Sequence, residues 1–174
     1  MNPEPTMPDS PDKDACAFLD ADHLAVKHLF VEYARLAYAP DARTNDDRAA
    51  LAARICDELS VHARIEEEIF YPALRQAVSG VADVVAEAEQ EHQQAKRLIA
   101  QIRETGAAGA AMDQLVADLA RAIEDHVKDE RDELFPKARS APGLDLAALG
   151  IQLKARQLQV MREAAPSVVR SRRG

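Results

Sequence analysis

Apolar residues recur every three or four positions along most of this chain, which is the spacing of amphipathic α-helices rather than of β-strands. A proline or a glycine interrupts the pattern at Pro40, Gly80 and Gly106, and Thr44 or Asn45 can cap the helix that follows the first break. The pattern therefore predicts four long helices, over residues 16–39, 47–78, 81–105 and 112–138.

Short connections force neighbouring helices to run antiparallel, so the expected fold is an all-α, up-down-up-down four-helix bundle. Pro72 should kink or end the last turns of the second helix. A fifth amphipathic segment, residues 144–164, either packs across the bundle or stays mobile. We divide the chain into a disordered proline-rich segment, the bundle, and a C-terminal amphipathic helix with a basic tail, at residues 1–15, 16–140 and 141–174.

The composition of the 174 residues agrees with one helical domain, since 47% are hydrophobic, only 4% are aromatic and Trp is absent. The net charge of −8 argues against nucleic acid as the main partner. We expect a cytoplasmic protein that does not contact a membrane, with plain thiols at Cys16 and Cys56. The basic residues from Gln152 onward are interpreted as a solvated appendage, with a docking role as the alternative.

The two halves of the predicted bundle repeat one another. DHLAVKHLF at 22–30 resembles EHQQAKRLI at 91–99, and HARIEEEIFYP at 62–72 resembles HVKDERDELFP at 126–136. The first pair shares an acid, a histidine and a lysine, and the second shares His-x-x-x-Glu followed by an aromatic residue and proline. A duplicated helical hairpin gives a bundle with approximate two-fold symmetry, so counterparts should face one another across the core.

Four of the five histidines occupy this repeated frame, one in each predicted helix: His23, His62, His92 and His126. Glu66 and Glu130 each follow a histidine by four residues, so each pair projects from one face of its helix. Counted from the turns at a rise of about 1.5 Å per residue, all six residues reach a similar depth in the bundle. We therefore expect the six side chains to converge.

Four imidazoles and two carboxylates are costly to bury without a shared partner, because an unpaired polar group costs several kcal/mol in an apolar interior. A metal ion removes this cost, and facing helices of a bundle are where di-iron and di-manganese carboxylate sites occur. Six ligands are too few to fill two octahedral shells. Each ion should therefore keep a position open for water or a small molecule.

Other charged residues near these six are assigned less specific roles. Glu67 and Glu68 are interpreted as a solvated face, and Glu58 as surface charge or as an acceptor for a histidine ring N–H. Lys27 and Lys96 occupy matching positions in the repeat, where they pair with nearby acids or extend along the surface.

Aromatic residues near the six are expected either to exclude water from the pocket or to serve as ordinary core, and these are Phe30, Phe70, Tyr71 and Phe135. Tyr33 and Tyr38 reach the site only if the first helix is suitably rotated. His28 lies five residues after His23, which turns it away from the ligand face, so it is not a candidate ligand.

The order His23, His62-x-x-x-Glu66 with FYP, His92, and His126-x-x-x-Glu130 with LFP resembles the hemerythrin-like, or HHE cation-binding, domain over about residues 16–140. The resemblance implies an up-down four-helix bundle with a non-haem di-iron centre. It carries over six residues as metal ligands, namely His23, His62, Glu66, His92, His126 and Glu130. Roles in this family include oxygen binding or sensing, iron sensing, and handling of nitric oxide or peroxide.

The sequence departs from the oxygen-carrying hemerythrins, in which the third helix supplies two histidines four residues apart and the last carboxylate follows its histidine by five. Lys96 and Arg131 occupy those positions here, and Glu130 follows its histidine by four residues. The sequence thus resembles the HHE branch, with a more open centre that favours sensing or redox reactivity. Cys16 has no partner cysteine nearby, so the iron–sulfur repair role of some relatives is not expected.

Our leading hypothesis is a protein with two non-haem iron ions that binds or reacts with O2, NO or peroxide, for sensing or detoxification. We expect a binding or sensing protein rather than a dedicated enzyme. Zn or Mn can replace iron at a site of nitrogen and carboxylate ligands. The alternatives are a metal-stabilised interaction module or iron-sensing module without turnover, and a metal-free helical adaptor.

Overall fold

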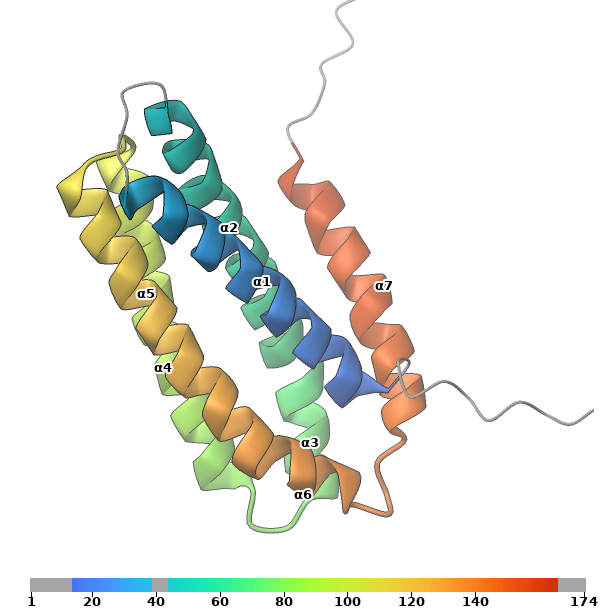
Figure 1. Ribbon diagram of the computed structural model, residues 1–174. Helices are drawn as coiled ribbons and strands as arrows, with labels where there is room; N and C mark the ends of the chain where they lie inside the picture. Colours follow the sequence, from blue (N-terminus) through green and yellow to red (C-terminus); the bar gives the residue numbers. More distant parts are fainter. Residues whose placement is uncertain (1–13, 39–43, 166–174) are drawn as a thin grey trace, which may run out of the picture.

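The computed structural model describes residues 14–38 and 44–165, and all regular structure in these two stretches is helical. Four long rods run alternately up and down (Figure 1). They begin with helices α1 (Ala15–Tyr38), α2 (Asn45–Ile65), α4 (Ala82–Thr105) and α5 (Ala110–Asp129). Helix α1 packs on α2, and α4 packs on α5. The predicted all-α, up-down-up-down bundle is confirmed.

The second and fourth rods each change helix type part of the way along. Helix α2 continues into a π-helical turn, η3 (Glu66–Phe70), and then into α3 (Tyr71–Ala77). Helix α5 continues in the same way into η4 (Glu130–Leu134) and α6 (Phe135–Arg139). A π turn bonds each N–H to the carbonyl five residues back, so it holds one residue more than an α-helical turn.

The two wide turns stand directly before the two prolines of the repeat. Tyr71 donates its backbone N–H to the carbonyl of Glu66, and Phe135 donates its backbone N–H to the carbonyl of Glu130. Pro72 and Pro136 have no N–H, and in a regular α-helix their rings would clash with a carbonyl four residues back. The sequence predicts a kink or an end near Pro72, whereas the wide turn lets the helix continue past it.

Local signals account for where several helices begin and end. Asp14 and Asp145 cap α1 and α7 (Leu146–Ala164), because each side chain accepts a backbone N–H from the first turn of its helix. Thr44, one of the two predicted caps, directly precedes α2. Gly106 ends α4 in the left-handed conformation (φ 64°), which glycine adopts without steric cost.

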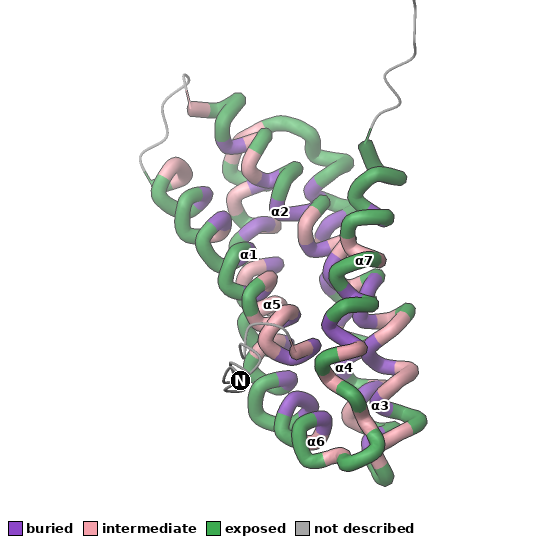
Figure 2. The backbone as a smooth tube through the Cα atoms, turned by 90° about the vertical axis from the view of Figure 1, so that its right-hand side faces the viewer, coloured by how far each residue is buried: buried purple, intermediate pink, exposed green. Residues whose placement is uncertain are grey.

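A layer of buried polar side chains divides the apolar core into two clusters. One cluster lies toward α3, α6 and the start of α1, and it includes Leu19 and Leu74. The other lies toward the opposite end of the bundle and includes Leu29, Ile55 and Ile99. Buried residues follow the inner faces of the helices on both sides of this layer (Figure 2). The polar layer is therefore held between two packed apolar regions.

Helix α7 packs against α1, α2 and η3, which is the first of its two predicted alternatives (Figure 1). Leu149, Leu153 and Val160 form the stripe that is buried on this face. The interpretation of the chain from Gln152 onward as a solvated appendage is thus wrong for its part in α7, because this apolar stripe outweighs the basic charge. Arg156, one of the basic residues, pairs with acids of the bundle and of α7 itself.

Parts of three predictions lie outside the described residues. These are the disordered segment as far as residue 13, the helix stop at Pro40, and the basic tail from residue 166. In the two described ranges, no helix combines the length and the apolar character needed to cross a membrane.

Candidate metal centre

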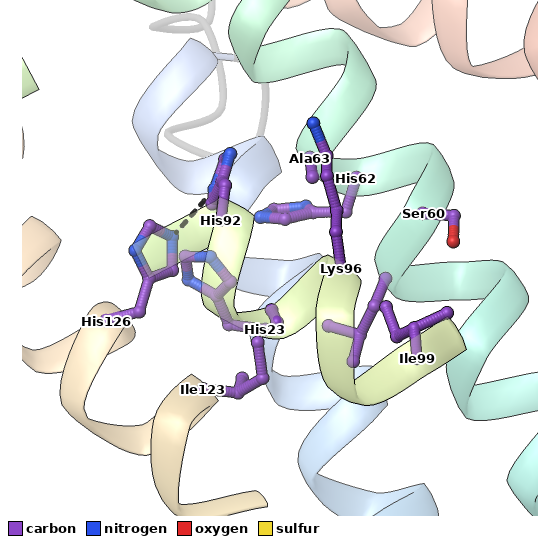
Figure 3. A pocket seen from close by; sticks show the side chains of 11 residues that line it. His23, Ser60, His62, Ala63, His92, Lys96, Ile99, Ile123 and His126 are labelled. Carbon is purple, nitrogen blue, oxygen red and sulfur yellow. Dashed lines mark hydrogen bonds between the residues drawn. The ribbon is translucent and has the colours of Figure 1, made fainter. Parts of the chain in front are cut away.

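The polar layer consists of the six side chains that the sequence singles out, so the structure brings all six together. They are His23, His62, Glu66, His92, His126 and Glu130, and none is more than 6% exposed. The four imidazoles come from α1, α2, α4 and α5 and lie around one central space (Figure 3). Four atoms, one each from His23, Glu66, His126 and Glu130, lie within 4.8 Å of one another.

Each carboxylate of the layer lies between two imidazoles. Glu66 is 3.2 Å from the Nε2 of His62 through one oxygen and 3.2 Å from the Nε2 of His92 through the other. The second carboxylate, Glu130, lies 3.3 Å from the Nε2 of His23 and 3.7 Å from that of His126. Every imidazole therefore presents its Nε2 to the centre, which is the arrangement that shared metal ligands require.

Each imidazole also faces a carboxylate with its other nitrogen, Nδ1. The pairs are His23 with Asp20 (3.6 Å), His62 with Asp22 (3.3 Å), His92 with Glu67 (2.9 Å) and His126 with Glu91 (2.8 Å). A carboxylate at Nδ1 holds the ring in place and favours the tautomer whose Nε2 lone pair faces inward. We call Asp20, Asp22, Glu67 and Glu91 the outer acids.

The pKa values of His62, His92 and Glu66 show that attraction between opposite charges outweighs the effect of burial, which favours the neutral forms. Burial would lower the pKa of His62, but Glu66 and the outer acid Asp22 raise it well above its ordinary value. Against the same effect of burial, Glu66 and Glu67 raise the pKa of His92 to about 9. Burial would raise the pKa of Glu66, yet the two histidines hold it well below its usual value. In the metal-free chain, protons on the histidines thus neutralise the glutamates, and a bound metal cation would displace these protons.

Several ligand atoms of the layer are buried and have no hydrogen-bond partner among the described residues. They are Nε2 of His23, Nε2 of His62, Oε1 of Glu66 and Oε2 of Glu130. Nε2 of His23 lies close to Glu130 but without hydrogen-bond geometry. Buried polar atoms without a partner are costly, and a cation that displaces the protons of the layer would satisfy them. The donor set of imidazole and carboxylate fits iron, zinc or manganese.

A seventh polar group, the hydroxyl of Tyr71, lies inside the layer. It donates to Oε1 of Glu130 at 3.0 Å, and it lies 3.3 Å from Nε2 of His92 and 3.5 Å from Oε2 of Glu66. Burial and the two glutamates raise the pKa of this phenol well above its ordinary value, so the hydroxyl keeps its proton as a donor. From its sequence position Tyr71 is expected either to exclude water from the pocket or to serve as ordinary core, and neither expectation includes this contact.

The π turn explains why Tyr71 reaches the layer. In an α-helix, the residue five positions after Glu66 would be rotated from it by about 140°. In the wide turn, the backbone of Tyr71 bonds to that of Glu66, which brings both side chains toward the same face. The counterpart in the repeat is Phe135, whose ring stacks on His23 with centroids 6.2 Å apart. A comparison of the two copies already reveals the extra hydroxyl in one of them.

Replacing Tyr71 by Phe should lower the free energy of unfolding of the metal-free chain by about 2 kcal/mol, because a buried carboxylate loses a hydrogen bond. Urea unfolding followed by circular dichroism measures this change. Tyr38→Phe is the matched control, since Tyr38 is 93% exposed, and it should leave stability unchanged. Equal stabilities of the two variants would show that the hydroxyl does not support the layer.

Of the other aromatic candidates, only Phe70 and Phe135 lie near the layer. Phe70 packs against Phe135 at 6.0 Å between ring centroids, and both are buried. Phe30 packs against the apolar cluster at the other end of the bundle. Tyr33 donates its hydroxyl to Asp113 there, and the ring of Tyr38 is exposed.

The charged candidates differ more from expectation. Glu67 is not a solvated face, because it accepts from His92 and pairs with Lys96 at 2.7 Å. Glu68 pairs with Arg64 and Arg156. Glu58 accepts a hydrogen bond from Arg54 rather than from a histidine ring. The acid that contacts the ring of His62 is Asp22. His28 is exposed, as its exclusion requires.

The outer acids Asp22 and Glu91 occupy matching positions in the sequence repeat. Each is the acid that directly precedes a histidine in the two copies of the repeat. In the structure, each contacts the histidine of the next rod, His62 or His126, rather than its own neighbour. Their matching positions in the repeat predict matching roles across the helix pairs.

A small cavity of about 20 Å³ adjoins the layer (Figure 3). The four imidazoles form one side of it, and apolar side chains form most of the rest, including Leu59, Ala95, Ile99 and Ile123. Lys96 also lines it, with its ammonium group paired to Glu67. A volume of this size holds about one water molecule or a comparably small ligand.

Comparison with known proteins identifies relatives of this chain. The sequence model described as "Hemerythrin HHE cation binding domain" matches residues 14–138. A DNA nickase of Nostoc sp. (strain PCC 7120) is 31% identical over 121 residues, which cover 68% of this chain and 32% of that protein. The chain thus spans about a third of the length of this curated relative.

Among solved structures, the crystal structure of a hemerythrin HHE cation binding domain-containing protein from Mycobacterium kansasii is similar, with a TM-score of 0.68 and 23% sequence identity. The likeness covers 86% of this chain and 88% of that one. At this level of identity it shows that the two chains share a fold.

Proposed function

The chain belongs to the hemerythrin HHE cation-binding domain family, and we propose that its layer of four histidines and two glutamates holds two non-haem iron ions. The proposed ligands are His23, His62, Glu66, His92, His126 and Glu130. The centre binds or reacts with O2, NO or peroxide at an open coordination position, in sensing or detoxification. Zinc or manganese are possible substitutes for iron.

The cavity beside the imidazoles is the observation that carries this proposal. Its volume of about 20 Å³, which is room for about one water molecule, favours a ligand as small as a diatomic molecule or peroxide over larger substrates. The side chains that line it opposite the histidines are mostly apolar, such as Ile99 and Ile123. A neutral diatomic molecule such as O2 or NO enters such a space without loss of hydrogen bonds, whereas an ion would pay a large desolvation penalty.

The residues around the proposed centre have three different roles: they hold the metal ions, orient the ligands and exclude water. The six ligands hold the ions, which supply the coordination and redox chemistry when bound. Asp22, Glu67 and Glu91 orient three of the four rings, and Phe70 and Phe135 exclude water from the side of the layer opposite the cavity. Tyr71 provides a proton donor within reach of both glutamates. Because only one half of the repeat has this hydroxyl, the two metal positions are chemically different.

The test is to load the purified chain with Fe(II) without air and to expose it to NO or to O2. We expect close to two irons per chain by metal analysis, and a change in the visible absorption spectrum with either gas. Iron uptake well below one per chain would contradict the proposed centre. Normal uptake with no spectral response would contradict the small-molecule chemistry alone.

Ala95→Val is expected to weaken NO binding about tenfold while metal content stays the same. Ala95 lines the cavity and is 7% exposed, so the two added methyl groups fill space that the ligand needs. Ala100→Val is the control, because Ala100 lies on the exposed face of the same helix. NO titration of both iron-loaded variants measures the difference, and equal affinities would place the ligand elsewhere.

A metal-stabilised interaction module is the second candidate, since the six ligands come from all four rods and an ion there would join them. In that case metal should raise the unfolding temperature while the spectrum stays unchanged in O2 and NO. The likeness to a DNA nickase adds no further candidate, because it covers a third of that protein and this chain has a net charge of −8.

A further inference from the structure

Gln157 of α7 reaches the outer contact of one proposed ligand. Its side-chain N–H donates to Oδ2 of Asp22 at 2.7 Å. The same Oδ2 lies 3.3 Å from Nδ1 of His62, and Nε2 of that ring lies 3.2 Å from Glu66. A continuous line of three contacts therefore runs from α7 to the centre of the polar layer.

The other outer acids are held from within the four-helix bundle. Arg131 pairs with Asp20, Lys96 pairs with Glu67, and Glu91 contacts His126 of the bundle. Among the four outer acids, Asp22 is the one for which the described residues show a hydrogen bond from α7. The donor is the uncharged side-chain amide of Gln157. One ligand of the layer thus depends on a helix outside the bundle, and the other three do not.

A second contact from the neighbouring residue of α7 approaches the same half of the layer. Arg156 donates to Oε2 of Glu68 at 2.6 Å and to its Oε1 at 3.2 Å. Glu68 lies in η3, two residues after Glu66. Gln157 and Arg156 therefore hold the layer from both sides, one through α1 and the other through the π turn. Helix α7 begins at Leu146, beyond the residues that match the family.

We infer that Gln157 is a positioning residue of the metal centre, and that docking of α7 sets the affinity for the metal ion bound by His62. This rests on the proposed metal centre. The amide N–H fixes the orientation of Asp22, the carboxylate fixes the plane and tautomer of the imidazole, and Nε2 is thereby aimed at the metal. Without Gln157, Asp22 turns toward water, since its side chain is already 25% exposed.

The test compares Gln157→Met with Gln159→Met in the full-length chain, titrated anaerobically with Fe(II) against a competing chelator. Methionine keeps the length of glutamine and removes the donor, and Gln159 is exposed on the same helix. We expect the affinity for one of the two ions to fall about tenfold in Gln157→Met and to stay unchanged in Gln159→Met. Gln157→Lys, which restores a donor toward Asp22, should recover most of the affinity.

Asp22→Ala separates positioning from simple packing of α7. If Gln157 acts through Asp22, adding Gln157→Met to Asp22→Ala should cause no further loss of affinity. An additive loss would overturn the inference, as would equal metal affinities of Gln157→Met and Gln159→Met. A wild-type chain that takes up no metal would overturn the proposed centre itself. A chain with normal uptake and no dependence on Gln157 would overturn the positioning role alone.

Discussion

Replacing both His62 and His126 by alanine is expected to abolish metal binding, with a loss of affinity of at least about a hundredfold for both ions. The two imidazoles come from different rods, and each lies within reach of a shared carboxylate, Glu66 or Glu130. Removal of an outer partner of a ligand already costs about 10- to 100-fold in affinity, so removal of two ligands costs more. Metal analysis after dialysis against a weak chelator measures the result.

His28→Ala is the matched control for this experiment, because His28 is the one histidine of the chain outside the polar layer. It should retain both ions. The double alanine variant also leaves buried space and unpaired carboxylates, which destabilises the core. The pair His62→Gln and His126→Gln keeps more of the volume and should lose metal with a milder loss of stability. Normal metal content in a folded glutamine variant would rule these histidines out as ligands.

Metal removal should reverse the way in which stability depends on pH. The pKa of His92 is raised from 6.5 to about 9 in the metal-free folded chain, and that of His62 is raised well above its ordinary value. Below the ordinary pKa of 6.5, His92 carries its proton in both the folded and the unfolded chain, and its full contribution to the free energy of unfolding is present. As pH rises through the folded value the proton is lost from the folded chain too, and the stabilisation disappears. The loss is about 3 kcal/mol for His92 alone.

At acidic pH the stability of the metal-free chain falls as the pH is lowered, because of Glu66. The pKa of Glu66 is held well below its usual value, so its stabilisation is present above about pH 4.5 and is lost as the pH falls further. The metal-free chain should therefore be most stable between about pH 5 and 6.5. The metal-loaded chain should instead gain stability toward pH 9, because metal competes with protons for the same imidazoles. Urea unfolding at pH 6 and pH 9 compares the two forms. Parallel changes in both would contradict this account.

The sequence was sufficient to predict the bundle and the meeting of the six side chains because both depend on helical periodicity and on the repeat. His62 and Glu66, four residues apart, share a face in any α-helix. His92 and His126 could be placed at one depth because the rise per residue is constant over the long helices. These predictions needed no knowledge of how the helices rotate against one another.

What the sequence did not predict depends on departures from regular geometry or on contacts between distant segments. Tyr71 reaches the layer through a π turn, which an α-helical count cannot anticipate. The roles of Glu67 and Asp22 depend on the rotation of neighbouring helices, and charged residues at helical spacing usually indicate a solvated face. Packing of α7 is decided by its apolar stripe, and its contact to Asp22 joins residues 135 positions apart.

The two π turns also carry information about ancestry. Each holds one residue more than an α-helical turn, and each begins at the glutamate and ends before the aromatic residue and proline of its copy. A duplicated hairpin that contains the extra residue accounts for both turns at once, whereas separate insertions would have to fall twice at the same place. The two halves differ at the residue that follows this turn, which is Tyr71 in one copy and Phe135 in the other, so they are not chemically equivalent.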